Sequence, residues 1–254
     1  MNVLITNDDG IFAPGILTLA KTVVKAGHQA VVVAPASQQS ATGHRLTIND
    51  SLMLSEMEID PGFKSFAING TPVDCVRIGR KLSDQAFDFC LSGINDGLNA
   101  GTDLFYSGTA AAAREASMLY LPSMAVSIEA NATEEMREKL AEYAVMIMEY
   151  IVYKRPMPRL TFCNLNAPAI APELVRYPKI APVSASFWLD EYVERVNPRG
   201  HRYFWLEPGV NKEPAEEGSD VDLILKGHMT VSFVGGFVNN NALYYPQLEQ
   251  ALEQ

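Results

Sequence analysis

The sequence predicts an α/β fold, in which a mostly parallel sheet is flanked by helices and followed by a C-terminal β-hairpin extension. Short apolar runs of strand length alternate with segments of helical periodicity through the first two thirds of the chain. The run at 29–34, QAVVVA, is continuously apolar, which is typical of a strand buried on both faces of a parallel sheet. Farther along, the turn signal Asn197-Pro198-Arg199-Gly200 separates two β-rich runs, and this pattern predicts the hairpin.

The elements of the first half follow from local patterns. A strand at 2–6 precedes a helix that ends at Gly27, and with the strand at 29–34 they complete a right-handed βαβ unit. Thr71 is a candidate N-cap with proline behind it, so a helix is expected over about 72–82. The remaining patterns predict a strand at 87–93, a helix at 107–119 and a strand at 123–128.

In the second half, Asn131 and Glu134 form a pattern like a capping box, which predicts the start of a long helix that ends before Pro156. A strand is expected at 159–164. The hairpin runs would contain both tryptophans, and an interaction arm competes about evenly with ordinary surface packing as their role. The last expected elements are a helix at 221–226, a strand at 229–234 and a helix at 245–252. We expect one domain over 1–254, with a core of about 1–180 and the arm and C-terminal elements at about 181–254.

Composition and charge exclude several classes of protein. The chain has 254 residues, of which 48% are hydrophobic and 20% charged, as in ordinary globular proteins. Its net charge of -10 disfavours a nucleic acid polymer as partner. The apolar runs are too short for a membrane span and no signal peptide is recognisable, so we expect no membrane association and a cytoplasmic location. Cys75, Cys90 and Cys163 lack a C-x-x-C pair and are expected to be reduced and buried.

Polar side chains follow three of the expected strands. Asp8 and Asp9 follow the first, Ser40 follows the second, and Asn95 closes the strand that begins near residue 87. In a parallel sheet these carboxyl ends share one edge, where ligands bind. An isolated Asp-Asp-Gly is usually a turn, but the two carboxylates repel each other and no Lys or Arg lies between Met1 and Ala20. An all-oxygen set of ligands from these four residues favours a hard cation such as magnesium or manganese.

A second cluster, Ser107-Gly108-Thr109, begins the alanine-rich helix. Gly108 allows close approach of the backbone, and the first helical turn presents N–H groups, so the cluster could hold a phosphate; a simple serine cap is the alternative. The P-loop, G-x-G-x-x-G and G-x-S-x-G motifs do not occur. The four histidines form no metal motif, and His44 is expected to be a hydrogen-bonded structural residue.

Four ordered motifs resemble the SurE survival-protein family of metal-dependent nucleotidases: VLITNDDGIFAPGI (3–16), QQSATGH (38–44), NGTPVDCV (69–76) and SGINDGLNAGTDLFYSGTAAAAREA (92–116). The resemblance implies a Rossmann-like core and one divalent cation per subunit, magnesium or manganese, held by Asp8, Asp9, Ser40 and Asn95. It also implies hydrolysis of nucleoside 5'-monophosphates, often of 3'-monophosphates, and in some members of short polyphosphate. Members form homodimers or homotetramers through an exchanged hairpin. The C-terminal part agrees less, because Ser219-Asp220 stands where the family has Thr-Asp and the later Thr-Pro is missing.

These residues predict a phosphomonoesterase site. Asp8, Asp9 and Asn95 are the expected catalytic residues, and Asn95, Ser107, Gly108 and Thr109 are expected to bind the phosphate of a nucleoside monophosphate. A water activated by the metal is the expected nucleophile, with Asp8 or Asp9 as base, and direct attack by Asp9 is the runner-up. Two other classes stay open: a non-catalytic nucleotide-binding sensor and a sugar-nucleotide transferase.

Overall fold

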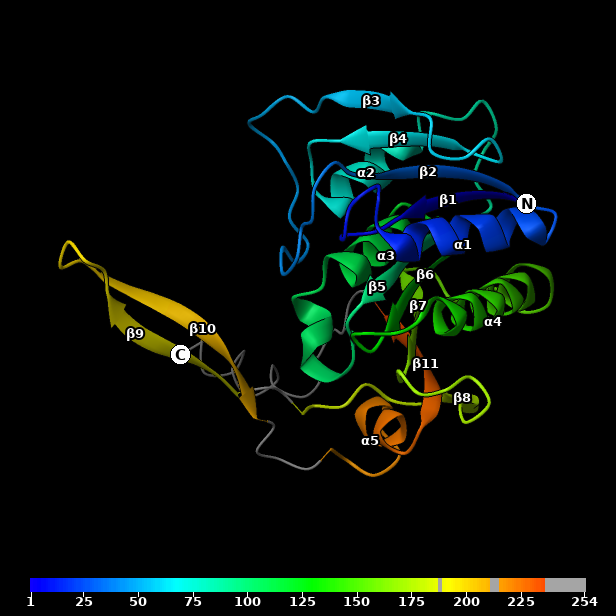
Figure 1. The fold of residues 1–254 in the computed structure, drawn as a ribbon. Coiled ribbons are helices and arrows are strands. Elements are labelled where there is room, and N and C mark those ends of the chain that lie inside the picture. Colours follow the sequence, from blue (N-terminus) through cyan, green and yellow to red (C-terminus); the bar gives the residue numbers. More distant parts are fainter. Residues whose placement is uncertain (187–188, 211–214, 236–254) are drawn as a thin grey trace, which may run out of the picture.

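The computed structural model of the protein describes residues 1–186, 189–210 and 215–235, and these form the predicted α/β fold (Figure 1). The main sheet has nine strands in the order β3-β4-β2-β1-β5-β6-β7-β11-β8 within this part of the chain. Its neighbours are parallel except for β3 with β4 and β11 with β7. The strands are β1 (Asn2–Thr6), β2 (Gln29–Pro35), β3 (Leu54–Met57), β4 (Lys64–Ile68), β5 (Phe89–Asp96), β6 (Ser123–Ile128), β7 (Thr161–Ala167), β8 (Arg176–Ile180) and β11 (His228–Gly235).

Helices cover both faces of the sheet, as Figure 1 shows. On one face, α1 (Pro14–Lys25) and α4 (Glu134–Tyr153) pack together and bury one apolar cluster that includes Leu19 and Leu140. On the other face, α2 (Pro72–Gly79) and α3 (Gly108–Met118) bury a second cluster that includes Val76 and Ala112. The central strand β1 is consequently buried over its whole length, which explains why its sequence is a continuous apolar run.

The predicted cap of α2 is confirmed, and α3 has the serine cap that is the alternative to a phosphate-binding turn. The Thr71 hydroxyl accepts a hydrogen bond from the backbone N–H of Asp74, and the Asp74 carboxylate in turn accepts the Thr71 N–H. The Ser107 hydroxyl oxygen accepts the N–H of Ala110 at 3.0 Å. Helix α2 ends at Gly79, three residues earlier than expected.

The start of α4 differs from the expected one. Thr133, rather than Asn131, is the N-cap, and its hydroxyl oxygen accepts the N–H of Met136 at 3.3 Å. Asn131 has a φ of 68°, whereas an N-cap residue needs an extended backbone like that of Thr133. Glu134 is therefore the first residue of the helix, and the expectation that it completes a capping box with Asn131 is wrong.

Three strands at or next to the edges of the sheet were not predicted. Strands β3 and β4 form one side of the sheet and β8 forms the other. Strands β3 and β8 are mostly exposed, so their sequences lack the apolar pattern that marks a buried strand. Strands β5 and β7 begin two residues later than expected and extend farther, to Asp96 and Ala167. The predicted helix at 245–252 lies outside the described residues.

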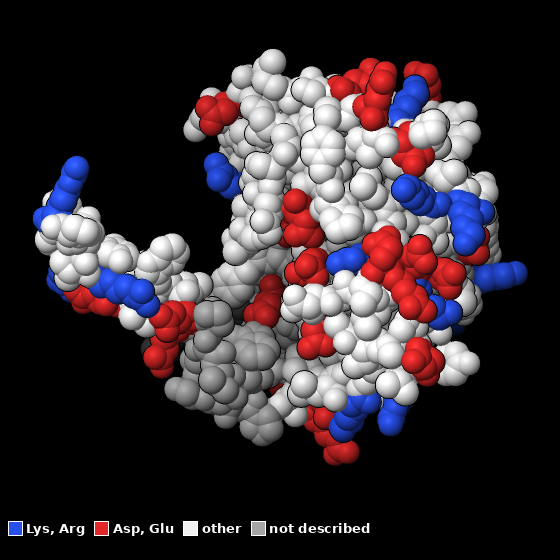
Figure 2. Space-filling view, in the orientation of Figure 1, with Lys and Arg blue, Asp and Glu red and all other residues white. Residues whose placement is uncertain are grey.

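The predicted hairpin is confirmed as β9 (Leu189–Val196) and β10 (Arg202–Val210), which form a separate antiparallel pair. It projects from the body of the molecule, to the left in Figures 1 and 2. Asn197 closes the turn by exchanging backbone bonds with Gly200 and His201. A short helix, α5 (Asp220–Leu225), then leads into β11. Of the two tryptophans expected here, Trp205 lies on β10, and Trp188 falls outside the described residues.

Strand β1 lies at the switch point of the sheet. From β1 the chain builds β2 and β4 on one side and then crosses back to place β5 on the other. In such sheets the loops at the carboxyl ends of the central strands diverge and leave room for a ligand. The loops after β1, β2 and β5 therefore meet at one edge. Among the described residues, no helix combines the length and hydropathy needed to cross a bilayer.

Candidate active site at the carboxyl edge of the sheet

The loop after β1 is held rigidly. The Asn7 side chain donates from Nδ2 to the carbonyl oxygen of Gly10 at 2.9 Å, and its Oδ1 accepts the Gly10 N–H at 3.2 Å. Gly10 has a φ of 104°, a conformation that favours glycine. The N–H of Ile11 then donates to the carbonyl oxygen of Pro35 at the end of β2. These bonds fix the backbone on both sides of Asp8 and Asp9.

Asp8 is bonded directly to the start of α3. Its side chain is buried, and Oδ2 accepts the backbone N–H of Thr109 at 3.1 Å. The Thr109 hydroxyl donates to Oδ1 of the same carboxylate. A Cβ at Gly108 would lie 2.9 Å from Oδ2 of Asp8, so only glycine permits this approach. The structure thus brings Asp8 and the Ser107-Gly108-Thr109 turn together, although they lie about 100 residues apart.

Asp9 contacts the end of β5. Its Oδ2 accepts the backbone N–H of Asp96 at 3.3 Å. Sequence reasoning singled out Asn95 but missed Asp96, whose only signal was its position beside Asn95. Burial raises the pKa of Asp8, and the neighbouring charge of Asp9 raises it further against the bonds from Thr109. Burial also raises the pKa of Asp9, and the Asp96 charge adds to this effect.

Ser40 follows β2 and Asn95 lies on β5, the two strands that flank β1. The N–H of Gln39 donates to the carbonyl oxygen of Asp8 at 2.7 Å, which places Ser40 one residue from that contact. Ser40 is exposed, and its oxygen accepts the Gln38 amide. The Asn95 amide nitrogen donates to the carbonyl oxygen of Gly97 at 2.7 Å, so its Oδ1 is the atom left to bind a ligand.

The arrangement suits a hard divalent cation. Within the described part of the chain, no ion pair includes Asp8 or Asp9, so no protein cation compensates the two adjacent carboxylates. The same residues contain no group of three or more His, Cys, Asp and Glu side chains that could hold a metal. A site here would depend on hydroxyl and amide oxygens beside the two carboxylates, and oxygen ligands favour magnesium or manganese.

The loop that carries Ser40 is anchored by a buried carboxylate on α3. Nε2 of His44 lies 2.8 Å from Oε2 of Glu115, which confirms that His44 is hydrogen-bonded. Arg77 on α2 pairs with the other carboxylate oxygen, its Nε 2.6 Å from Oε1, without hydrogen-bond alignment. Burial alone would raise the pKa of Glu115, but the His44 bond and the Arg77 charge outweigh it and hold the pKa below its ordinary value. Sequence reasoning missed this cluster because its members lie far apart along the chain.

A sizeable cavity lies elsewhere. It has a volume of about 1110 Å³ and is lined by Asn2 of β1, by residues of β2, β3 and β4, and by the loops before β2, β4 and β5, which include His28 and Phe63. Asn2 and Gln29 begin their strands, so this cavity is at the amino edge of the sheet, away from Asp8. The polar cluster at the carboxyl edge, rather than this cavity, combines carboxylates with a helix N-terminus.

Comparison with known proteins gives a consistent result. The family model described as "Survival protein SurE" matches residues 3–190. The 5'-nucleotidase SurE of Maridesulfovibrio salexigens is 39% identical over 233 residues, covering 91% of this chain and 92% of that protein. The 5'-nucleotidase SurE of Kosmotoga olearia is 35% identical over 255 residues, covering 100% and 99%. The crystal structure of the SurE protein from Aquifex aeolicus matches over 100% of both chains, with a TM-score of 0.83 and 31% identity. On the evidence of sequence and fold together, the chain belongs to the SurE survival-protein family.

Proposed function

We propose that the protein is a metal-dependent 5'-nucleotidase that hydrolyses nucleoside 5'-monophosphates to nucleoside and phosphate. The observation that carries this proposal is the bond between Asp8 and the first turn of α3, which places a carboxylate against a helix N-terminus. A carboxylate alone would repel a phosphate, whereas a carboxylate that binds a cation beside helical N–H groups can hold one. Relatives named 5'-nucleotidase SurE support the choice of substrate.

The cation would be held by Asp8, Asp9, the Ser40 hydroxyl and Oδ1 of Asn95. When bound, a divalent ion of this kind neutralises charge on a phosphoryl group and lowers the pKa of a bound water. Thr109 uses both its N–H and its hydroxyl to orient Asp8, so its part is to position that carboxylate. The Gly108 N–H and the Ser107 hydroxyl are the donors at this turn that would hold phosphoryl oxygens. The second amide hydrogen of Asn95 would donate to another phosphoryl oxygen.

Asp9 is the favoured base. Its carboxylate is less buried than that of Asp8 and has one protein donor, the Asp96 N–H, whereas two donors of Thr109 hold Asp8. Asp9 would accept a proton from the attacking water, the water oxygen would bond to phosphorus, and the bond from phosphorus to the ester oxygen would break. The proton held by Asp9 would then pass to the departing ester oxygen, which gives the nucleoside hydroxyl. Direct attack by Asp9 would instead produce an aspartyl-phosphate. A search for phosphorylated enzyme during a single turnover in oxygen-18 water distinguishes the two routes. A trapped aspartyl-phosphate, or solvent oxygen-18 in the Asp9 carboxylate, would exclude the water route.

The test is phosphate release from a panel of nucleoside 5'- and 3'-monophosphates and short polyphosphate, with magnesium, manganese or a chelator. Wild type is compared with Asp9→Asn, which keeps the shape of the side chain and removes its charge. We expect metal-dependent release by wild type and a loss of at least about 100-fold in the variant, the size typical of a removed catalytic group. Full activity in Asp9→Asn would refute the site. Metal-dependent nucleotide binding without release would favour a sensor.

Three further features belong to this proposal. Magnesium or manganese, one ion per subunit, suits the oxygen ligands better than zinc or copper. A homodimer or homotetramer built through the hairpin would cover the exposed side chains of Tyr192, Phe204 and Leu206. A cytoplasmic location suits three cysteines that are all free and buried: Cys75, Cys90 and Cys163.

A further inference from the structure

Asp220, the first residue of α5, is a buried carboxylate that the proposed reaction does not use. It is 0% exposed and belongs to no ion pair among the described residues. Its Oδ1 accepts the backbone N–H groups of Ser184 and Val221, each at 2.8 Å, and its Oδ2 accepts the N–H of Gly101 at 3.1 Å. A charge this deeply buried is stable only because these donors satisfy it. Its partners therefore have to stay in place.

The first partner of Asp220, Gly101, is close in the chain to the Ser107-Gly108-Thr109 turn that is proposed to bind phosphate. Gly101 opens a short 3-10 helix, η1 (Gly101–Phe105), and the N–H of Ser107 donates back to the carbonyl oxygen of Asp103 at 3.2 Å. Only Tyr106 separates η1 from Ser107, so the 3-10 helix and the turn that contacts Asp8 are joined by one residue and this hydrogen bond. Any shift of η1 moves Ser107 and Gly108 as well.

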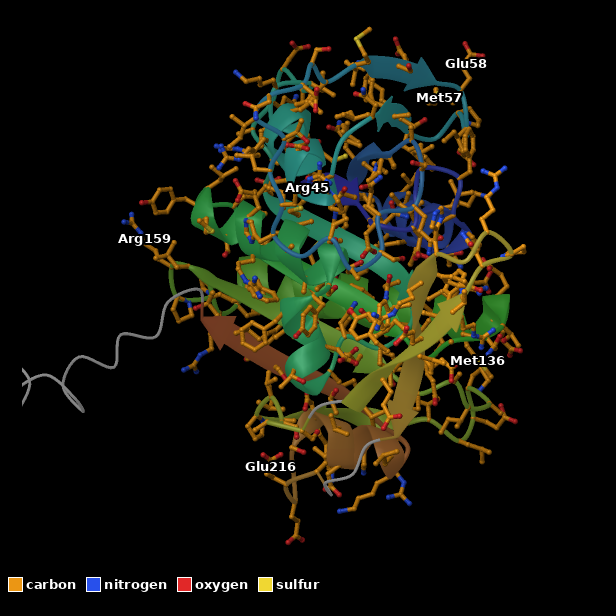
Figure 3. The ribbon with its side chains drawn as sticks, turned by 90° about the vertical axis from the view of Figure 1, so that its left-hand side faces the viewer. Arg45, Met57, Glu58, Met136, Arg159 and Glu216 are labelled. Carbon is orange, nitrogen blue, oxygen red and sulfur yellow. The ribbon has the colours of Figure 1, made fainter. Side chains whose placement is uncertain are left out.

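The second partner of Asp220, Ser184, is close in the chain to the β9–β10 hairpin. Ser184 lies on the segment that precedes β9. Two residues later, the carbonyl oxygen of Ser186 accepts both the N–H of Thr102, at 3.2 Å, and its hydroxyl, at 3.1 Å. Glu216, labelled at the lower end of the molecule in Figure 3, accepts the N–H of Ala185 at 3.1 Å and also the Ser184 hydroxyl. The base of the hairpin and η1 thus meet at one buried junction.

We propose that Asp220 is a positioning residue of the nucleotidase site: by binding Gly101 and Ser184 together, it fixes the Ser107-Gly108-Thr109 turn relative to the base of the hairpin. The inference rests on the proposed function. It makes phosphate affinity depend on a residue that touches neither substrate nor metal, and it couples the arm to the site.

Asp220→Asn breaks one side of this junction selectively. The asparagine has one acceptor oxygen and one amide nitrogen in place of two oxygens. With the oxygen at the position of Oδ1 it keeps the bonds from Ser184 and Val221, and its nitrogen then faces the Gly101 N–H, donor against donor. The opposite orientation would lose two bonds rather than one. The link to η1 is therefore the one that fails.

Asp222→Asn is the matched control. Asp222 lies on the same helix and also accepts a backbone N–H, that of Gly218 at 2.8 Å. It pairs with Lys226 as well and, among the described residues, has no hydrogen bond with η1. We expect Asp220→Asn to raise the KM for AMP and the inhibition constant of inorganic phosphate about tenfold, with kcat within about twofold, because the turn binds the phosphoryl group in both ground and transition states. Asp222→Asn should change neither constant by more than about twofold. Amide hydrogen exchange over 101–109 should be faster only in Asp220→Asn.

Several outcomes test the positioning role of Asp220. Equal phosphate affinity and equal exchange over 101–109 in Asp220→Asn and wild type would overturn the inference, and so would equal losses in both variants. If Asp220→Asn does not fold, Gly101→Ala replaces it: a Cβ there lies 2.8 Å from the carbonyl oxygen of Ser186, and the same changes in KM and exchange are expected. If wild type neither releases nor binds phosphate, the proposed function fails. The exchange measurement then still decides whether Asp220 holds η1.

Discussion

Thr109 donates both its backbone N–H, at 3.1 Å, and its hydroxyl to the carboxylate of Asp8. The helix that would bind phosphate is therefore bonded to the residue that would bind the metal, and the two parts of the site cannot move independently. A carboxylate ligand held by fixed donors loses little freedom when it binds a cation, which favours binding.

Thr109→Val tests this relationship. Valine has nearly the same shape but removes the hydroxyl donor from a fully buried position. We expect activity and manganese affinity to fall about 10- to 100-fold, the size typical of lost partners of a metal ligand. Calorimetric titration with manganese and steady-state rates measure the two effects. Thr109→Ser keeps the donor and should stay close to wild type; equal losses in both variants would contradict the role of the hydroxyl.

Gly108→Ala tests the close approach of the α3 backbone to Asp8. The new Cβ would lie 2.9 Å from both Cβ and Oδ2 of Asp8, two atoms fixed by burial, so the carboxylate has to shift. A displacement of this kind can lower activity on the order of 100-fold. Alanine is the better helix former, so a lower rate cannot come from helix propensity. Gly235→Ala, where a Cβ meets nothing within 4 Å, should keep wild-type rates.

Sequence predicted most of the buried strands and helices of the core, and the polar residues near the ends of those strands. Asp8 and Ser40 follow strands and Asn95 lies near the end of β5, and the rule that parallel strands present their carboxyl ends to one edge predicts that they share one site. It could not predict that Thr109 donates its backbone N–H and its hydroxyl to Asp8, because that contact joins two residues separated by 101 positions in the sequence. Edge strands β3 and β8 escaped prediction since their side chains are exposed and carry no burial pattern. The pairing of His44 with Glu115 depends on tertiary packing in the same way.

Asp9→Asn should stabilise the metal-free protein. Burial and the neighbouring Asp96 raise the pKa of Asp9, so its ionised form is disfavoured in the folded state and favoured in the unfolded one. Stability linked to this group is fully present below its unfolded pKa and is lost as pH rises through the folded pKa. At neutral pH with a chelator, we expect a Tm about 2–4 °C above wild type, which corresponds to about 1 kcal/mol in a chain of this size.

Bound metal should reverse the order of the Tm values of wild type and Asp9→Asn. With saturating manganese, the Tm of wild type should rise because the ion binds only the folded state, and the Tm of Asp9→Asn should rise much less. Differential scanning fluorimetry at several manganese concentrations measures both arms. A metal-free Asp9→Asn that melts below wild type would show that the two carboxylates do not oppose folding.

Glu115 should make stability sensitive to acid. Its pKa is held below the ordinary value of 4.5, so it stabilises the fold above pH 4.5 and this contribution is lost as pH falls through the lower folded pKa. Wild type should therefore lose Tm between about pH 5 and pH 3 more steeply than Glu115→Gln. Glu149→Gln is the control, because Glu149 also pairs with a histidine, His28, but is 41% exposed. Parallel curves for wild type and Glu115→Gln would refute this role of the carboxylate.

The hairpin offers the last test, since its apolar side chains are exposed in the part of the chain that the structure describes. Leu206 lies opposite Tyr192 in the β9–β10 register, and Phe204 lies on the same face; their exposed fractions are 50%, 71% and 54%. Placing a charge at Leu206 costs little in an isolated hairpin but is unfavourable in a buried interface. Sedimentation velocity of Leu206→Asp should therefore show a smaller species than wild type with an unchanged circular dichroism spectrum. Tyr153→Asp, on an equally exposed end of α4, should leave the oligomer intact, and a wild type that already sediments as a monomer would contradict the expected assembly.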